Sequence, residues 1–314
     1  MSAFFYLCFM KSFLLIISFF FVSVLQAQDT LMPMIFLDDV VITEKNNGFS
    51  VEDFVGYVKS DTTFYMGFKH LRYYSHKYKS ELKIFDAKGK KIGTLKKDGT
   101  HYSNGKKSWI VNDFISDEGK IFKRNGDYQY YTPEAFDEVF FPKDTIAVSL
   151  KLSDDKNKGE SQNMRDAKTV GFSIGTDDVE QSKGGISKKL AIFDIEMQQY
   201  YDYTIGQTTY KNRDCYSFTI KVKKDLSAKD EKKALIRKIV SYFDKQNFNV
   251  IYREYKFVYS NLFIDLDMDI TVNMDYVNGK HVPIDIFYKG FWDVILFKPE
   301  RAEFKLQNTN FLVH

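Results

Sequence analysis

Cysteine is nearly absent from this chain: only Cys8 and Cys215 occur among 314 residues. Cys8 lies in an N-terminal segment that we expect to be removed. The one remaining thiol cannot form an intramolecular disulfide, so we expect a hydrophobic core to hold the fold together. The chain can build a large core, because 17% of its residues are aromatic.

An excess of charge of one sign is also missing. The 45 Lys and Arg residues nearly balance the 42 Asp and Glu residues, and the two kinds are interspersed. Nucleic-acid binding relies on a strongly basic surface, so we expect no nucleic acid as a partner. After the N-terminus no apolar run reaches the length of a membrane span. We therefore expect no transmembrane segment after signal cleavage.

Motifs that would name a reaction are scarce as well. We recognise no GxSxG nucleophile motif, no phosphate-binding or dinucleotide-binding glycine motif and no paired catalytic carboxylates. None of the histidines has metal-ligand spacing or adjoins a cysteine, although His70 and His76 could share one face of a strand. The histidines are His70, His76, His101, His281 and His314. We predict no catalytic, cofactor-binding or metal-binding residues and no cofactor. An enzyme would need catalytic residues dispersed along the chain.

The N-terminus carries the longest apolar run. Lys11 precedes residues 13–22, FLLIISFFFV, and small and polar residues lead to Ala27. A basic residue, an apolar run too short to cross a bilayer and a small residue at a cleavage point predict a signal peptide over residues 1–27. An uncleaved N-terminal anchor is the alternative. We therefore expect a protein of the periplasm or the cell exterior.

Two details refine this N-terminal prediction. Translation from Met10, with Lys11 directly behind it, would give the signal a more ordinary form. Cys8 precedes the apolar run and lacks the small-residue context of a lipoprotein cleavage site. We therefore expect no lipid anchor.

The N-terminal half shows the pattern of an antiparallel meander. Thr62–Tyr78 is rich in Thr, Phe and Tyr and is predicted as strand, which Leu82–Phe85 continues. Thr145–Leu152 alternates apolar and polar residues as a further strand. Turn dipeptides at short intervals predict hairpins rather than βαβ units. They are Lys88-Gly89, Asp98-Gly99, Asn104-Gly105, Glu118-Gly119 and Asn125-Gly126.

Short helices interrupt the strands. Ser50 and Asp53 occupy capping positions for a helix over residues 51–60. Thr132-Pro133-Glu134 begins a second helix near 133–141, which Pro142 ends. A charged stretch, Asp225–Lys238, has Ser227 and Asp230 in capping-box positions and is compatible with a third.

The C-terminal half has the clearest strand pattern. In Leu262–Tyr276 the apolar residues take alternate positions, and the acidic and polar residues take the others. Tyr210–Val222 and Val250–Tyr259 are further strands, and Asn278-Gly279 makes a hairpin turn. A strand with one apolar and one polar face belongs to an antiparallel sheet covered on one side.

Periodicity divides the chain into regions. Residues 28–152 form an N-terminal β-rich region, 153–189 a polar flexible linker without apolar periodicity, and 190–314 a C-terminal antiparallel sheet. The predicted fold class is mainly β: a long, curved antiparallel sheet or half-barrel with a few short helices.

Acidic residues on one strand face are the first candidate site. Asp265, Asp267 and Asp269 share a face, with Asp275 further along. Several carboxylates suit a hard cation such as Ca²⁺. Alternate residues on a strand lie roughly 7 Å apart, however, which favours a solvated face paired with Lys and Arg such as Arg253 and Lys256.

Three other features have both a functional and a structural interpretation. Cys215 could be a redox thiol, although a half-buried strand cysteine fits as well. The basic stretch Lys221–Lys238 could meet anionic headgroups, but its interspersed acids favour an ordinary solvated surface. The Phe and Tyr residues could line an apolar cavity on a curved sheet, or fill a core with aromatic pairs.

Residues 202–216, DYTIGQTTYKNRDCY, followed by residues 239–253, IVSYFDKQNFNVIYR, resemble the middle of envelope proteins with a LolA-like sheet. The resemblance covers roughly residues 200–290. The N-terminal region, with Thr62-Thr63-Phe64-Tyr65, and the phenylalanine-rich signal resemble uncharacterised secreted proteins of Bacteroidota. The LolA-like resemblance implies a half-barrel whose concave face shelters helices or an apolar ligand, in a family that carries lipoprotein acyl chains. It transfers no site residue.

The leading hypothesis is therefore a non-enzymatic exported envelope protein. It would bind a lipid, a lipoprotein acyl chain or an outer-membrane protein on a curved sheet. A structural or interaction module without a ligand is the alternative, and an enzyme with dispersed catalytic residues is a third possibility.

Overall fold

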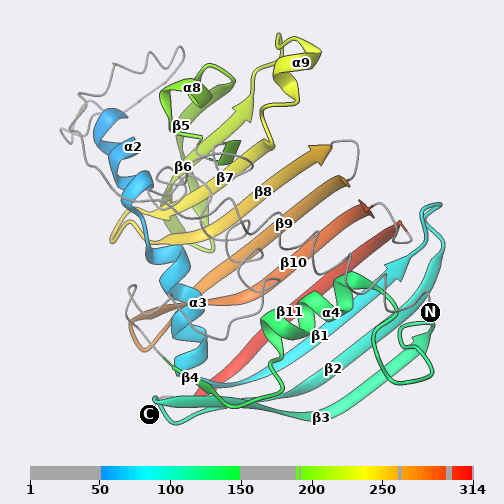
Figure 1. Ribbon diagram of the computed structural model, residues 1–314. Coiled ribbons are helices and arrows are strands. Elements are labelled where there is room, and N and C mark those ends of the chain that lie inside the picture. Colours follow the sequence, from blue (N-terminus) through cyan, green and yellow to red (C-terminus); the bar gives the residue numbers. More distant parts are fainter. Residues whose placement is uncertain (1–50, 149–188, 191, 261–263, 295–298, 313–314) are drawn as a thin grey trace, which may run out of the picture.

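The computed structural model describes residues 51–148, 189–190, 192–260, 264–294 and 299–312. These residues form one antiparallel sheet of eleven strands (Figure 1). The strands are β1 (Ser75–Phe85), β2 (Lys91–Ser103), β3 (Lys107–Gly119), β4 (Ile146–Ala147), β5 (Tyr201–Tyr210), β6 (Arg213–Val222), β7 (Ile236–Asp244), β8 (Val250–Ser260), β9 (Ile264–Val277), β10 (Lys280–Val294) and β11 (Glu300–Leu312). The prediction of a mainly β, antiparallel fold is confirmed.

The strand order is β4-β3-β2-β1-β11-β10-β9-β8-β7-β6-β5. Strands that follow one another in sequence are neighbours in the sheet, except β4 and β5, and the long-range pairing of β1 with β11 joins the two series. The sheet is not closed, because β4 and β5 lie at opposite edges. One continuous sheet thus joins the predicted N-terminal and C-terminal regions. The linker between them falls almost wholly outside the described residues, so that division stays a prediction.

Helices α2 (Val51–Ser60), α3 (Thr63–Tyr73) and α4 (Tyr131–Phe140) lie on the same face of the sheet (Figure 1). We call this the sheltered face and the opposite one the outer face. Phe54 of α2 lies 5.5 Å, ring to ring, from both Phe218 and Phe243. Phe136 of α4 lies 4.6 Å from Phe304. The helices on the sheltered face therefore dock through aromatic contacts.

Alternation along the strands sends apolar side chains to the sheltered face. In β11, Ala302, Phe304 and Leu306 are buried, whereas Arg301 and Lys305, at alternate positions, are exposed. Burying a side chain such as Phe304 contributes about 1.5–3 kcal/mol. The one-sided burial predicted from the C-terminal alternation is confirmed.

The helices over residues 51–60 and 133–141 are confirmed as α2 and α4. Ser227 caps the short helix α9 (Ala228–Glu231) by accepting a hydrogen bond from the Asp230 backbone N–H. A further short helix, α8 (Ile195–Gln198), precedes β5.

The prediction of a strand over Thr62–Tyr78 is wrong for most of its length, because residues 63–73 form α3. Phe64, Phe68 and Leu71 recur at helical spacing, which outweighs the β-propensity of the local aromatic and Thr residues. Gly67 lets α3 approach the sheet. A Cβ there would lie 2.2 Å from Cε of Met274.

Four of the five N-terminal turn dipeptides carry a glycine with positive φ, at Gly89, Gly105, Gly119 and Gly126. Asp98-Gly99 is not a turn: it lies inside β2, at a bulge in the pairing with β3. Glycine is required there because a Cβ would lie 2.3 Å from the Val111 carbonyl oxygen. Of the strand predicted over Thr145–Leu152, residues 146–147 are strand and residues 149–152 lie outside the described part.

Candidate functional site

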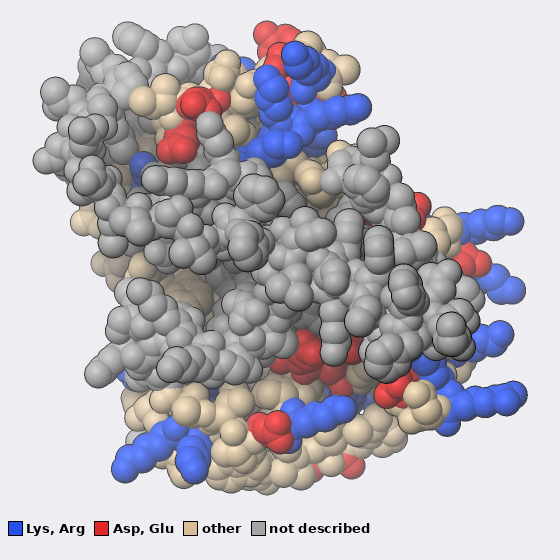
Figure 2. All heavy atoms as spheres, viewed as in Figure 1, with Lys and Arg blue, Asp and Glu red and all other residues tan. Residues whose placement is uncertain are grey.

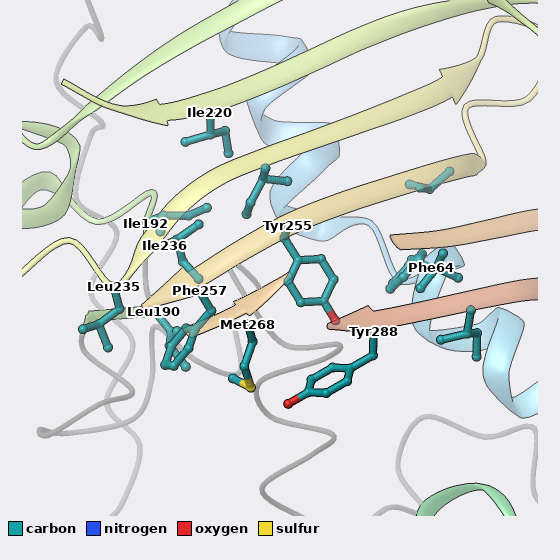
Figure 3. Close-up of a cluster of buried hydrophobic side chains, with 14 of the residues drawn as sticks. Phe64, Leu190, Ile192, Ile220, Leu235, Ile236, Tyr255, Phe257, Met268 and Tyr288 are labelled. Atoms are coloured by element: carbon teal, nitrogen blue, oxygen red, sulfur yellow. The ribbon is translucent and has the colours of Figure 1, made fainter. Parts of the chain in front are cut away.

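The central part of the sheltered face gathers apolar side chains from five successive strands (Figure 3). All are buried, and Phe257, Ile220 and Ile236 are at most 1% exposed. They are Ile220 from β6, Ile236 from β7, Tyr255 and Phe257 from β8, Met268 from β9 and Tyr288 from β10. These residues belong to one continuous buried cluster on the sheltered face.

Register explains how these side chains meet. Phe257 pairs with Met268, and Tyr255 pairs with Ile270, so that the strongest alternation in the sequence is matched across β8 and β9. Methionine has three rotatable bonds and a polarizable sulfur, so it adapts to partners of different shape. A mixture of aromatic rings and methionine is suited to apolar ligands.

The tyrosines on this surface remain neutral. Burial raises the pKa of both Tyr255 and Tyr288 above the ordinary tyrosine value. The Trp292 indole N–H donates to the Tyr288 hydroxyl at 2.5 Å. These hydroxyls add polarity without charge, so the surface favours an uncharged, apolar occupant.

Charged groups on the sheltered face fasten α4 to the sheet. Lys97 of β2 lies 2.6 Å from an Asp137 oxygen of α4, and the Tyr128 hydroxyl donates to the same carboxylate. At the other end of α4, buried Glu300 accepts a hydrogen bond from the Thr132 backbone N–H at 2.8 Å. Burial raises the Glu300 pKa although the Thr132 donors lower it. These groups therefore have a structural role in holding α4 against the sheet.

A similar tie holds the start of α3. Arg253 of β8 lies 3.8 Å from Asp61 and 4.3 Å from the Phe64 ring centroid. Its Nε donates to the Ser241 hydroxyl at 3.0 Å. We predicted that Arg253 would pair with the aspartates of β9. That prediction is wrong, because Arg253 points to the sheltered face and the aspartates lie on the outer face.

The β9 aspartates belong to an ordinary charged surface. Lys256 Nζ lies 2.9 Å from Asp267 and 3.2 Å from Asp269, as predicted for that lysine. Asp275 instead lies 3.1 Å from Arg213. Within the described residues, no group of three or more His, Cys, Asp or Glu could hold a metal ion.

The histidines separate into two pairs beside α3. His76 and His101 stack at 4.7 Å, and each ring directs Nδ1 at the Tyr74 carbonyl oxygen. His70 directs its Nδ1 at the His281 carbonyl oxygen, 2.9 Å away. His70 and His76 do not share a strand face, because His70 belongs to α3. His314 lies outside the described residues.

Burial keeps three of these rings neutral. It lowers the pKa of His76 to about 3, with the neighbouring His101 adding to the effect. It lowers the pKa of both His101 and His281 to about 4. The Tyr74 and Thr63 backbones raise these pKa values slightly. Neutral, stacked histidines act here as packing residues.

Cys215 is fully buried, at 0% exposure, and its thiol donates to the Arg213 carbonyl oxygen at 3.3 Å. Burial raises the pKa of the thiol. A protonated, inaccessible thiol is a poor nucleophile, which favours the structural interpretation over the redox one.

Three residues of the basic stretch form ion pairs. Lys233 lies 2.8 Å from Asp230, and Arg237 lies 3.1 Å from Glu231. Lys238 reaches Glu254 of β8 at 2.7 Å. Figure 2 shows blue and red side chains mixed around α9 at the top of the molecule. This arrangement agrees with a solvated surface.

A shallow groove of about 440 Å³ lies beside the β1–β2 turn. Asp267, Asp269, Lys289 and Arg301 line it among others, and Phe291 contributes one ring. Lys289 lies 3.3 Å from Glu303, and Arg301 stacks over Phe291 at 4.5 Å. These four charged groups therefore already have partners within the protein.

The statement that the chain has no GxSxG motif is wrong. Residues 171–175 read GFSIG and match the spacing GxSxG of a hydrolase nucleophile turn. That motif depends on a strand-to-helix turn above a mainly parallel sheet. Ser173 lies outside the described residues, and the described sheet is antiparallel throughout. The spacing alone therefore assigns no role to Ser173.

No family model and no curated protein matches the chain. Among solved structures, it is similar to an outer membrane lipoprotein-sorting protein domain from Vibrio parahaemolyticus, with 11% identity over 78% of this chain and 88% of the other and a TM-score of 0.25. A DUF1329 family protein from Desulfovibrio piger matches with 12% identity over 80% and 93%, at a TM-score of 0.22. Lipovitellin matches with 7% identity over 76% of this chain and 25% of its own, at 0.26. TM-scores of this size assign neither a family nor a function.

Proposed function

We propose that this chain is a non-enzymatic exported protein of the cell envelope that binds an apolar ligand on its sheltered face. The ligand class is a lipid or a lipoprotein acyl chain, and the location is the periplasm or the cell exterior. An outer-membrane protein that exchanges such a ligand would be its natural partner. The N-terminal signal sequence and the LolA-like resemblance of residues 200–290 motivate these parts of the proposal.

The observation that carries the proposal is the chemistry of the sheltered face. Phe257, Met268 and Tyr288 belong to an apolar surface that crosses several strands without an interrupting charge. The charged residues of the same face, such as Lys97 and Arg253, are committed to holding helices. A surface of this kind can shelter an acyl chain and offers no group that would react with it. No described helix is long and apolar enough to cross a bilayer.

Native mass spectrometry of protein purified from its own envelope tests ligand binding. The expected result is co-purifying lipid, and the lipid-free protein should take up a fluorescent fatty acid that natural lipid displaces. Met268→Trp would place a larger ring beside Phe257 and is expected to reduce probe binding several-fold. Thr271→Trp, on the same strand but on the outer face, is the matched control. Absence of both lipid and probe binding would overturn the proposal.

A ligand-free interaction module is the alternative that this experiment separates. It predicts no probe binding but specific crosslinks to one envelope protein. An enzyme would reveal itself by turnover of the extracted lipid instead of simple release.

A further inference from the structure

Strand β3 forms an open edge of the sheet for most of its length. In the described part of the chain, β4 pairs only with its first two residues, Lys107 and Ser108. Beyond them the strand exposes large apolar side chains: Val111 is 44%, Phe114 51% and Ile115 52% exposed. An unpaired edge that carries apolar side chains is a template for another strand.

The backbone of β3 presents hydrogen-bonding groups along this edge. The Val148 N–H donates to the Lys106 carbonyl oxygen, which therefore points away from β2. In an antiparallel strand this direction alternates with every residue. The N–H and C=O groups of Ile110 and Asn112 consequently point outward as well.

A β-bulge at Asp113 then shifts the alternation by one residue. Asn112 pairs with Gly99 and Phe114 with Asp98, which leaves Asp113 as the extra residue. Beyond the bulge the Lys120 N–H donates to the Ile92 carbonyl oxygen of β2. Before the bulge, the even-numbered residues 110 and 112 direct their backbone groups outward. Beyond it, the odd-numbered residue 115 does so.

We propose that two copies of this chain pair edge to edge, antiparallel, along residues 109–116 of β3. Ile110 of one copy lies opposite Ile115 of the other, and Val111 lies opposite Phe114. Ile110 and Ile115 both direct their backbone groups outward, so each such pair exchanges two hydrogen bonds. The two-fold axis passes beside Asp113.

The faces of the side chains match in the same register. Ile110 and Ile115 pair within the sheet with buried His101 and Lys97, so both lie on the sheltered face. Val111 and Phe114 lie on the outer face. Without the bulge, Ile110 and Ile115 would lie on opposite faces and could not meet in a two-fold pair.

Charge favours a second copy as the occupant. Lys106 and Lys107 lie at one end of the segment, and Asp117 and Glu118 lie at the other. None of these four side chains forms an ion pair with a described residue in the monomer. Antiparallel pairing brings the basic end of each copy towards the acidic end of the other. Backbone pairing ends at residue 109, because β4 fills the edge at Ser108.

Sedimentation velocity across a range of concentrations tests the assembly. The purified protein is expected to form a dimer, and Phe114→Lys is expected to weaken it about tenfold or more, which corresponds to at least about 1.4 kcal/mol. Ile195→Lys is the matched control, because Ile195 is also an exposed apolar residue, at 62%, but lies on α8. A monomer at every concentration, or a dimer that survives Phe114→Lys, would overturn the proposal.

Disulfide trapping tests the register. Val111 and Phe114 face each other as a non-hydrogen-bonded pair, with Cα atoms expected about 4.5 Å apart. That distance suits a disulfide. Val111→Cys combined with Phe114→Cys should therefore give a covalent dimer on a non-reducing gel after mild oxidation. Within one copy the bulge leaves the two positions two strand rises, about 7 Å, apart, which is beyond the usual span of a disulfide. Val111→Cys with Ser116→Cys is the offset control, and equal crosslinking in both variants would refute the register.

Discussion

The two faces of the sheet come from the same strands but obey different physical rules. On the sheltered face, buried charged groups have dedicated partners: Lys97 pairs with Asp137, and Glu300 accepts a hydrogen bond from Thr132. On the outer face, Lys256 divides itself between Asp267 and Asp269 at half-exposed positions. A solvent-exposed ion pair contributes little to the free energy of unfolding, whereas removing one partner of a buried pair is strongly destabilising. The comparison teaches that similar contacts have very different importance on the two faces.

The largest expected effect comes from breaking a sheltered ion pair. Asp137→Ala leaves Lys97 buried without its partner and removes the acceptor of the Tyr128 hydroxyl. We expect a loss of about 3–5 kcal/mol in the free energy of unfolding, measured by urea titration. Asp269→Ala on the outer face should cost about 1 kcal/mol or less. Equal losses in the two variants would erase the distinction between the faces.

Apolar residues on the two faces should also differ in how much they contribute to stability. Phe304 is 2% exposed and packs against Phe136. Phe304→Ala should lower the free energy of unfolding by about 3–5 kcal/mol. Phe287 lies on the outer face of the adjacent strand, where Lys305 covers its ring at 5.8 Å. Phe287→Ala should cost about 1 kcal/mol. Thermal unfolding of the two variants checks this contrast, and a larger loss for Phe287→Ala would contradict it.

Acid should weaken the sheltered side selectively. The pKa values of His76, His101 and His281 lie at about 3, 4 and 4 in the folded protein, below the ordinary value of 6.5. The unfolded chain therefore binds more protons, and stability is lost as pH falls from about 6.5 towards 4. Each histidine adds up to about 1.4 kcal/mol per pH unit in that window. Glu300, whose pKa is raised, acts in the opposite direction nearer its own titration.

Urea titrations at pH 7.5, 6 and 5 measure this dependence. His101→Phe retains a ring against His76 but removes one titrating group, so its stability should fall less steeply with acid. Identical stability of the native protein at pH 7.5 and 5 would refute the assignment of neutral buried histidines.

The smallest effect concerns Cys215. Its burial and raised pKa predict very slow reaction with a thiol reagent in the folded protein and fast reaction in urea. Thr309→Cys places a thiol at an exposed outer position of β11 and should react at once. Comparable rates for Cys215 and the introduced thiol would show that Cys215 is accessible.

The sequence predicted the strand alternation well and the early chain poorly. Residues 264–277 follow a strict two-residue period, and Asn278-Gly279 has the positive φ values of a tight hairpin turn. These are local signals. Thr62–Tyr78 carries β-forming residues, yet Phe64, Gly67 and the face of β10 together select a helix, and that partner surface is invisible in a local window.

The candidate site, too, could be predicted only as far as local signals reach. The excess of Phe and Tyr was visible in the sequence, but only pairing across strands shows that Phe257 and Met268 meet. Arg253 was assigned to the wrong face because it lies three residues before Lys256, and regular alternation along β8 places residues three apart on opposite faces. The turn between β5 and β6 uses Lys211 and Asn212 at positive φ, which no glycine announces.

The position of β11 has a consequence for how the chain acquires its shape. This strand follows all the other described strands in the sequence, yet it lies between β1 and β10 inside the sheet. The two meanders, β1–β3 and β5–β10, have mostly local contacts and can form early. Their union waits for one long-range closure, which is entropically slow. We therefore expect the arrival of β11 to limit the folding rate, and until then both meanders keep an extra unpaired edge.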